Sequence, residues 1–103
     1  MPHDQPSATS AEDLRDQFMD NCRAKAQYWT HVQNGYTTED RLMGLLHSIL
    51  VTIDGQAGLP AFDLVARPHP DDKEYLQSQG EDWVEDGTVI NADSLLHELL
   101  YRR

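Results

Sequence analysis

The sequence predicts a small α+β domain in which a small antiparallel sheet is covered by helices. Three observations predict it. Apolar residues recur at helical spacing through the first half of the chain, residues 61–67 alternate apolar and polar side chains, and an Asp-Gly pair at 86–87 separates two short β-prone runs. The expected order is α-α-β-α-β-β-α, in one domain over residues 10–103 that follows a loose, disordered tail over residues 1–9.

The first helix is expected to begin after Ser10, whose hydroxyl is a good N-cap. One face then carries an apolar stripe, and the helix should stop before the breaker pair Asn34-Gly35. Because Cys22 lies on that stripe, we interpret it as a small packed apolar residue. The stripe consists of Leu14, Phe18, Cys22, Ala26 and Trp29.

The second helix is expected to start at Thr37 and to end at Asp54-Gly55. Its apolar arc is the widest in the chain, so we expect it to be the central element of the core. Gly44 and Ser48 form a ridge of small residues that would let another element approach closely. The arc consists of Leu42, Leu45, Leu46, Ile49, Leu50 and Ile53.

The alternation over residues 61–67 predicts a strand that places Phe62, Leu64 and Ala66 on one face. Pro68-His69-Pro70 should end that strand, because proline cannot donate to a ladder. Pro70 also suits the first turn of a short helix that stops at Gly80.

The next run predicts a hairpin, with Trp83-Val84 paired to Thr88-Val89-Ile90 around the turn Glu85-Asp86-Gly87. Asn91 should then cap a final helix. The apolar face of that helix would consist of Leu95, Leu96, Leu99 and Leu100.

The charge is strongly negative, at −10, and unevenly spread. Between Asp71 and Glu98 there are nine acidic residues against Lys73 alone. Such a surface repels phosphate backbones, so direct nucleic-acid binding is not expected, whereas a basic protein partner or a metal ion is favoured. The alternative is that the acids only keep a small protein soluble.

The composition also bears on location. No apolar run approaches the roughly 20 residues that span a bilayer, so no membrane partner is expected. The N-terminus carries no secretory pattern, and the single cysteine cannot form an internal disulfide. We therefore expect a cytoplasmic protein. No glycine-rich phosphate loop or Cys-x-x-Cys pair occurs, so no cofactor is expected.

The candidate binding surface is an aromatic residue among acids: Glu81, Asp82, Trp83, Glu85 and Asp86. An exposed tryptophan surrounded by carboxylates suits a basic partner through cation–π and charge contacts. The alternative is that Trp83 anchors a core beneath the hairpin.

The run His69-Pro70-Asp71-Asp72 resembles the zinc motif of the N-acetylglucosaminyl deacetylases. The resemblance implies His69 and Asp72 as metal ligands and Asp71 as the catalytic base. That family places the motif early in a longer domain and adds a distal His-x-x-His element, which this sequence lacks. Since a strand end and a helix start explain the same residues, we expect no metal and keep a small metal-dependent hydrolase as an alternative.

A wider resemblance covers Arg41 to Tyr101 and is carried by Gly58–Leu64, Pro68–Tyr75 and Leu95–Glu98. These segments resemble a family of small uncharacterised proteins of bacterial and phage genomes, and the resemblance implies no activity. The sequence thus predicts a non-enzymatic, phage-related interaction protein that binds a basic protein partner. The alternatives are the metal-dependent hydrolase and a small-ligand-binding module.

Overall fold

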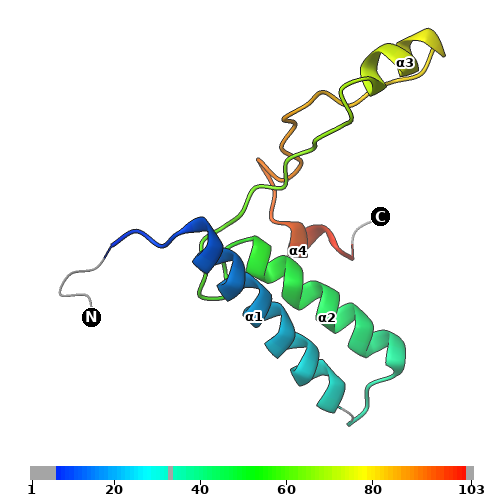
Figure 1. The fold of residues 1–103 in the computed structure, drawn as a ribbon. Helices are drawn as coiled ribbons and strands as arrows, with labels where there is room; N and C mark the ends of the chain where they lie inside the picture. Colours follow the sequence, from blue (N-terminus) through cyan, green and yellow to red (C-terminus); the bar gives the residue numbers. More distant parts are fainter. Residues whose placement is uncertain (1–6, 33, 102–103) are drawn as a thin grey trace.

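The computed structural model describes residues 7–32 and 34–101. In that part of the chain the protein is mainly helical and forms no sheet, so the predicted α+β class is wrong. Figure 1 shows the four helices, and none of them is long and apolar enough to cross a bilayer. They are α1 (Ala11–His31), α2 (Thr38–Ile53), α3 (Asp72–Ser78) and α4 (Leu96–Leu99).

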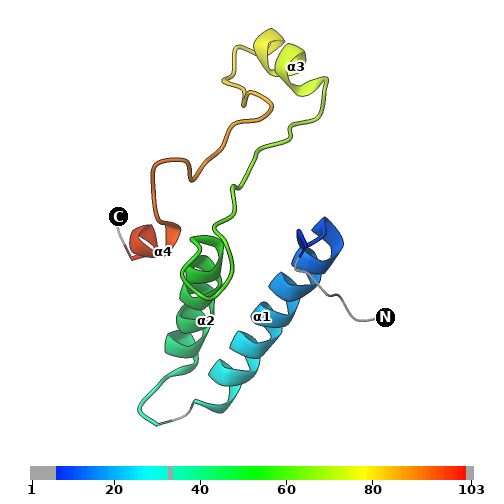
Figure 2. The ribbon, with the colours of Figure 1, turned by 90° about the vertical axis from the view of Figure 1, so that its left-hand side faces the viewer.

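The bounds of α1 and α2 confirm the caps predicted from the sequence. Ser10 Oγ accepts a hydrogen bond from the backbone N–H of Asp13 at 3.0 Å. Thr37 and Asp40 form a reciprocal capping box, which satisfies two N–H groups at the start of α2. The two helices run antiparallel, side by side (Figures 1 and 2). Of the predicted tail, residues 1–6 lie outside the described residues, and residues 7–9 precede α1 as exposed, irregular chain.

The predicted ridge on α2 receives the indole of Trp29 from α1. A Cβ at Gly44 would lie 2.5 Å from Trp29 Cη2, so only glycine leaves room for the ring. Trp29 Nε1 donates to Ser48 Oγ at 2.9 Å. The two small residues therefore set how closely α1 and α2 approach.

Residues 62–91 leave the helix pair and return to it as an arm, with α3 at its far end (Figures 1 and 2). Near its root the two sides of the arm meet at a single antiparallel bridge between Val65 and Val89. Ala66 N–H donates to Thr88 O at 2.8 Å, and Ile90 N–H donates to Leu64 O at 3.0 Å.

The predicted hairpin therefore pairs residues 88–90 with the wrong segment. Residues 88–90 pair with residues 64–66, because Gly87, at φ 85°, turns the chain so that its N–H reaches Ala66 O at 2.9 Å. Asn91 ends the ladder on the other side: its side chain accepts from Leu64 N–H at 2.9 Å and donates to Phe62 O at 2.8 Å. With Pro68 beyond the bridge, the pairing cannot extend into a sheet.

The core is much smaller than the sequence predicts. Among the described residues Ile53 is the one buried large apolar side chain, and Leu46, expected in the core, is 42% exposed. The buried helical residues do belong to α2. Its wide apolar arc is only partly covered, because residues 62–91 form the arm and do not pack along the helix pair. The radius of gyration is accordingly 18.4 Å, against about 13 Å for a compact domain of this length.

Candidate interaction surface

The predicted binding residues lie on the arm, in the segment that follows α3. We call Glu81, Asp82, Trp83, Glu85 and Asp86 the tip patch; all five are exposed. Trp83 is 38% exposed, so it does not anchor a core beneath a hairpin.

Two of these residues meet a lysine from α3. Trp83 Nε1 donates to Glu85 Oε1 at 2.9 Å, and Lys73 Nζ donates to the same oxygen at 2.9 Å. The Lys73 ammonium also lies 5.4 Å from the centroid of the Trp83 ring. This distance is within the range of a cation–π contact. An aromatic face and a carboxylate thus already hold an ammonium group here.

The same contacts lower the pKa of Glu85 below its ordinary value. The hydrogen bond from the Trp83 indole is the main cause, followed by the hydrogen bond and the charge of Lys73. Since both donors favour the ionised carboxylate, Glu85 carries its negative charge throughout the neutral range.

The other three residues of the tip patch have different surroundings. Glu81 N–H donates to Leu76 O at 2.9 Å, which helps to end α3. Asp86 lines a hollow of about 280 Å³, and this hollow is also lined by Lys73, Val84, Glu85 and the segment Pro68–Pro70. Asp82 is exposed and carries a further negative charge.

The zinc-like motif forms the start of α3 and is held by local hydrogen bonds. Asp72 Oδ2 accepts from His69 N–H at 3.2 Å, and His69 Nδ1 accepts from Asp71 N–H at 3.1 Å. His69 and Asp71 are exposed, with 3.8 Å between His69 Nδ1 and Asp71 Oδ2. Within residues 7–32 and 34–101 no three His, Cys, Asp or Glu side chains are grouped so that they could hold a metal ion.

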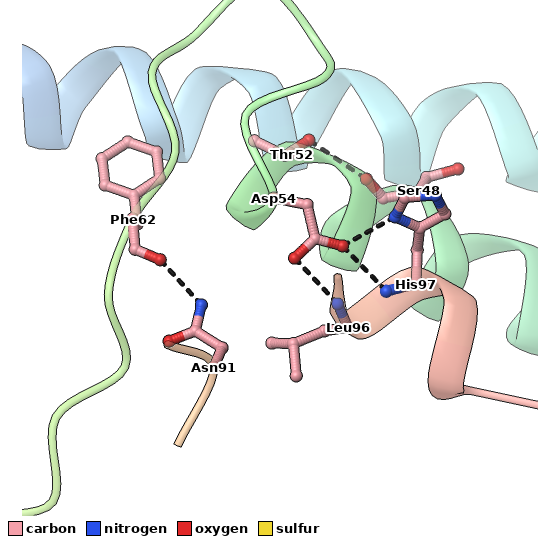
Figure 3. A network of polar contacts seen from close by, with 7 residues as sticks. All are labelled: Ser48, Thr52, Asp54, Phe62, Asn91, Leu96 and His97. Carbon is pink, nitrogen blue, oxygen red and sulfur yellow. Dashed lines mark hydrogen bonds and ion pairs between the residues drawn. The ribbon is translucent and has the colours of Figure 1, made fainter. Parts of the chain in front are cut away.

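Sequence reasoning missed a buried polar network that ties the C-terminal helix to the end of α2 (Figure 3). Asp54 Oδ1 accepts from Leu96 N–H at 2.9 Å, and Oδ2 accepts from His97 N–H at 2.8 Å. The ring nitrogen Nδ1 of His97 lies 2.6 Å from Oδ2, and the Asp54 side chain is only 1% exposed. The prediction that Asn91 caps this helix is therefore wrong, because the acceptor comes from Asp54.

The pKa of Asp54 is lowered despite its burial. Burial by itself raises the pKa, but the backbone N–H groups of His97 and Leu96, together with the His97 ring, outweigh that effect. On the outer side, His47 packs edge-to-face on His97 at 5.5 Å between ring centroids. The sequence offered no sign of this network, since Asp54-Gly55 is also what an ordinary helix end contains.

An open groove of about 620 Å³ lies beside the network, between the end of α2, the arm root and α4. The apolar residues Ile53, Phe62 and Leu95 are among those that line it. Four carboxylates border it and no basic residue does, so the groove extends the negative surface toward the helix pair. The four are Asp54, Asp63, Asp93 and Glu98.

Comparison of the chain with protein-family models found no match, and comparisons with curated proteins and with solved structures found none.

Proposed function

We propose that this chain is a non-enzymatic interaction protein that binds a basic protein partner through the tip patch. The observation that carries the proposal is the ammonium of Lys73, which is held between the Trp83 ring and the Glu85 carboxylate. A partner's lysine or arginine needs the same chemistry, and here it is displayed on exposed side chains.

The charge of the arm supports the same function. Residues 62–91 carry eight acidic residues against two basic ones, Arg67 and Lys73. Because the arm projects from the helix pair, residues 71–86, which carry seven of the eight acids, lie together at the end of the arm that holds α3 (Figure 1). A field of this kind accelerates encounter with a cationic surface.

The partner that fits is a protein with a lysine- and arginine-rich face, such as one that binds nucleic acid. The acids of the arm would then take the place of phosphate charges. The proposal includes a cytoplasmic location, as the single cysteine favours.

A defined probe tests the proposal: a fluorescein-labelled peptide of eight lysines, with a peptide of eight glutamates as the negative probe. We expect the lysine peptide to bind and its affinity to fall steeply between low and physiological salt, since exposed charges are screened. The quadruple variant Glu81→Gln, Asp82→Asn, Glu85→Gln, Asp86→Asn should lose most of this binding.

The matched control removes four exposed acids from the helix pair and so changes the net charge equally. These substitutions are Glu12→Gln, Asp16→Asn, Asp20→Asn and Glu39→Gln. The control should retain the affinity of the unmodified chain. Equal losses in the two variants would contradict a localised site and leave only non-specific attraction.

A second experiment uses Lys73, because its ammonium occupies the position that a partner's ammonium would take. Lys73→Gln should strengthen binding of the lysine peptide by roughly 2- to 5-fold, the worth of a freed exposed cation–π site. Lys25→Gln, the same charge change on α1, should have a smaller effect. If both substitutions act alike, the Trp83–Glu85 pair is not where the peptide binds.

A further inference from the structure

The three asparagines of the chain differ in how their side-chain amides are held. Asn21 donates to Ala57 O at 3.4 Å and accepts from Thr52 Oγ1 at 2.8 Å. The amide of Asn91 is bound on both sides by backbone groups of the arm root, at 2.8 and 2.9 Å. Asn34 is exposed, and no hydrogen bond joins its amide to another residue of the described part of the chain.

Asn34 is followed by a glycine, in the segment that joins α1 to α2 at the end of the helix pair away from the arm (Figure 1). Gly35 is at φ 74°, and the place that a Cβ would take has no heavy atom within 4 Å beyond its chain neighbours. The Gly35 N–H has no backbone acceptor among the described residues. The nitrogen next to the Asn34 amide is thus not shielded by a side chain on its own residue.

Two further pairs, Asp54-Gly55 and Asp86-Gly87, could undergo related chemistry, but in both the glycine nitrogen is hydrogen-bonded. In the first pair the glycine N–H donates to Thr52 O at 3.1 Å, and in the second it donates to Ala66 O at 2.9 Å. The carboxylate of the first pair is also only 1% exposed. A nitrogen held in this way cannot attack a neighbouring side chain until the bond opens.

We propose that Asn34 is a site of spontaneous deamidation, and that hydrogen bonds protect the other two asparagines and both Asp-Gly pairs in the folded chain. The Gly35 nitrogen gives its proton to a solvent base and forms a bond to Cγ of Asn34. The Cγ–Nδ2 bond breaks, and the amide nitrogen leaves as ammonia with a proton from water. Water then opens either carbonyl of the resulting cyclic imide, which gives aspartate or isoaspartate. No electron is transferred, and water is the co-reactant.

Either product adds one negative charge to the −10 of the chain. Isoaspartate also lengthens the main chain by one methylene between α1 and α2. The modification concerns the loop end of the helix pair and not the tip patch, so it does not depend on the function proposed above.

The test is incubation of the folded full chain at neutral and at mildly alkaline pH, followed by ion-exchange chromatography and peptide mapping by mass spectrometry. We expect an acidic species to accumulate, and to do so faster at alkaline pH because the attacking nitrogen must lose its proton. Conversion at Asn34 should be at least about tenfold faster than at Asn21 or Asn91, whose amides must first release their hydrogen bonds. Comparable conversion at all three positions, or an unmodified Asn34, overturns the proposal.

Asn34→Gln is the matched variant, because it keeps an exposed amide while its longer side chain closes the ring far more slowly. This variant should yield no acidic species and should keep the melting temperature of the unmodified chain. An acidic species that still forms at the same rate would place the modification elsewhere and overturn the assignment to Asn34.

Unfolding in guanidinium chloride tests the protection. Isoaspartate at Asp54 and Asp86 should form several-fold faster in the unfolded chain than in the folded chain, since the glycine nitrogens are then released. The rate at Asn34 should change little. Equal rates in the two states at Asp54 and Asp86, or a larger acceleration at Asn34 than at those two positions, would contradict the role assigned to the hydrogen bonds.

Discussion

Asp54 and His97 are 43 residues apart in the chain, yet one carboxylate oxygen of Asp54 accepts from the backbone N–H of His97 and lies 2.6 Å from its ring Nδ1. The helix that contains His97, α4, has four residues and no capping side chain of its own. A helix so short is not stable alone in water. Its position against α2 therefore depends on Asp54.

Replacement of Asp54 by alanine should detach α4. The substitution leaves the N–H groups of Leu96 and His97 without their acceptor, and hydrogen bonds to a charged group contribute about 1.5–3 kcal/mol. We expect a loss of about 2–3 kcal/mol in the free energy of unfolding, measured by urea denaturation. Amide exchange at Leu96 and His97 should accelerate, whereas Asp63→Ala, a change of an exposed acid on the arm, should affect neither quantity. Slow exchange at both amides in Asp54→Ala would contradict the capping role.

Because of the same carboxylate, the free energy of unfolding should decrease at acid pH. Because the folded state lowers the pKa of Asp54, its contribution is present above the unfolded pKa of about 3.9 and is lost as the pH falls through the folded value. The difference in unfolding free energy between the unmodified chain and Asp54→Asn should therefore be constant near neutral pH and should shrink below about pH 4. A difference that stays constant down to pH 2.5 would mean that the charge of Asp54 is not what α4 requires.

Substitution Gly44→Ala tests the contact between α1 and α2. Alanine favours a helix over glycine by about 1 kcal/mol, but here its Cβ would lie 2.5–2.6 Å from three ring atoms of Trp29. The ring cannot move freely, because Ser48 accepts from its Nε1 and Tyr36 packs on it edge-to-face. Overpacking costs about 1–3 kcal/mol, so we expect net destabilisation, read as a lower melting temperature. The control Ser48→Ala should cost about 1 kcal/mol and leave the ring in place. A higher melting temperature in Gly44→Ala would show that the ring is free to move.

Two aliphatic side chains of α2 should contribute very differently to the free energy of unfolding. Ile53 is 9% exposed and Leu46 is 42% exposed. Ile53→Ala should therefore cost about 2–5 kcal/mol, and Leu46→Ala less than about 1 kcal/mol. Both variants are compared with the unmodified chain by urea denaturation at the same low protein concentration. A large cost for Leu46→Ala under these conditions would mean that another part of the chain covers it.

Several features of the fold follow from neighbouring residues alone and were predicted from the sequence. The caps at Ser10 and Thr37, the end of α2 at Asp54 and the short helix between Pro70 and Gly80 depend on groups within about one helical turn. The alternation around Leu64 is also observed, as residues 62, 64 and 66 are less exposed than residues 63, 65 and 67. The tip patch as a binding surface stays a prediction, and the contacts of Lys73 with Trp83 and Glu85 were not predicted.

The tertiary structure decided which segments these elements pair with and pack against. Residues 88–90 could pair with 83–84 or with 64–66, and β-propensity does not predict the observed partner. The turn at Gly87 and the side chain of Asn91 select residues 64–66. Asp54 could end α2 in any fold, but only the return of the chain brings α4 within reach of its carboxylate. The wide apolar arc on α2 likewise indicates which side chains need to be covered, but it does not indicate which segment of the chain covers them. Local hydrogen bonds depend on residues a few positions apart, so the sequence predicts them. Long-range contacts depend on which of many similar surfaces come together, so only the folded chain shows these contacts.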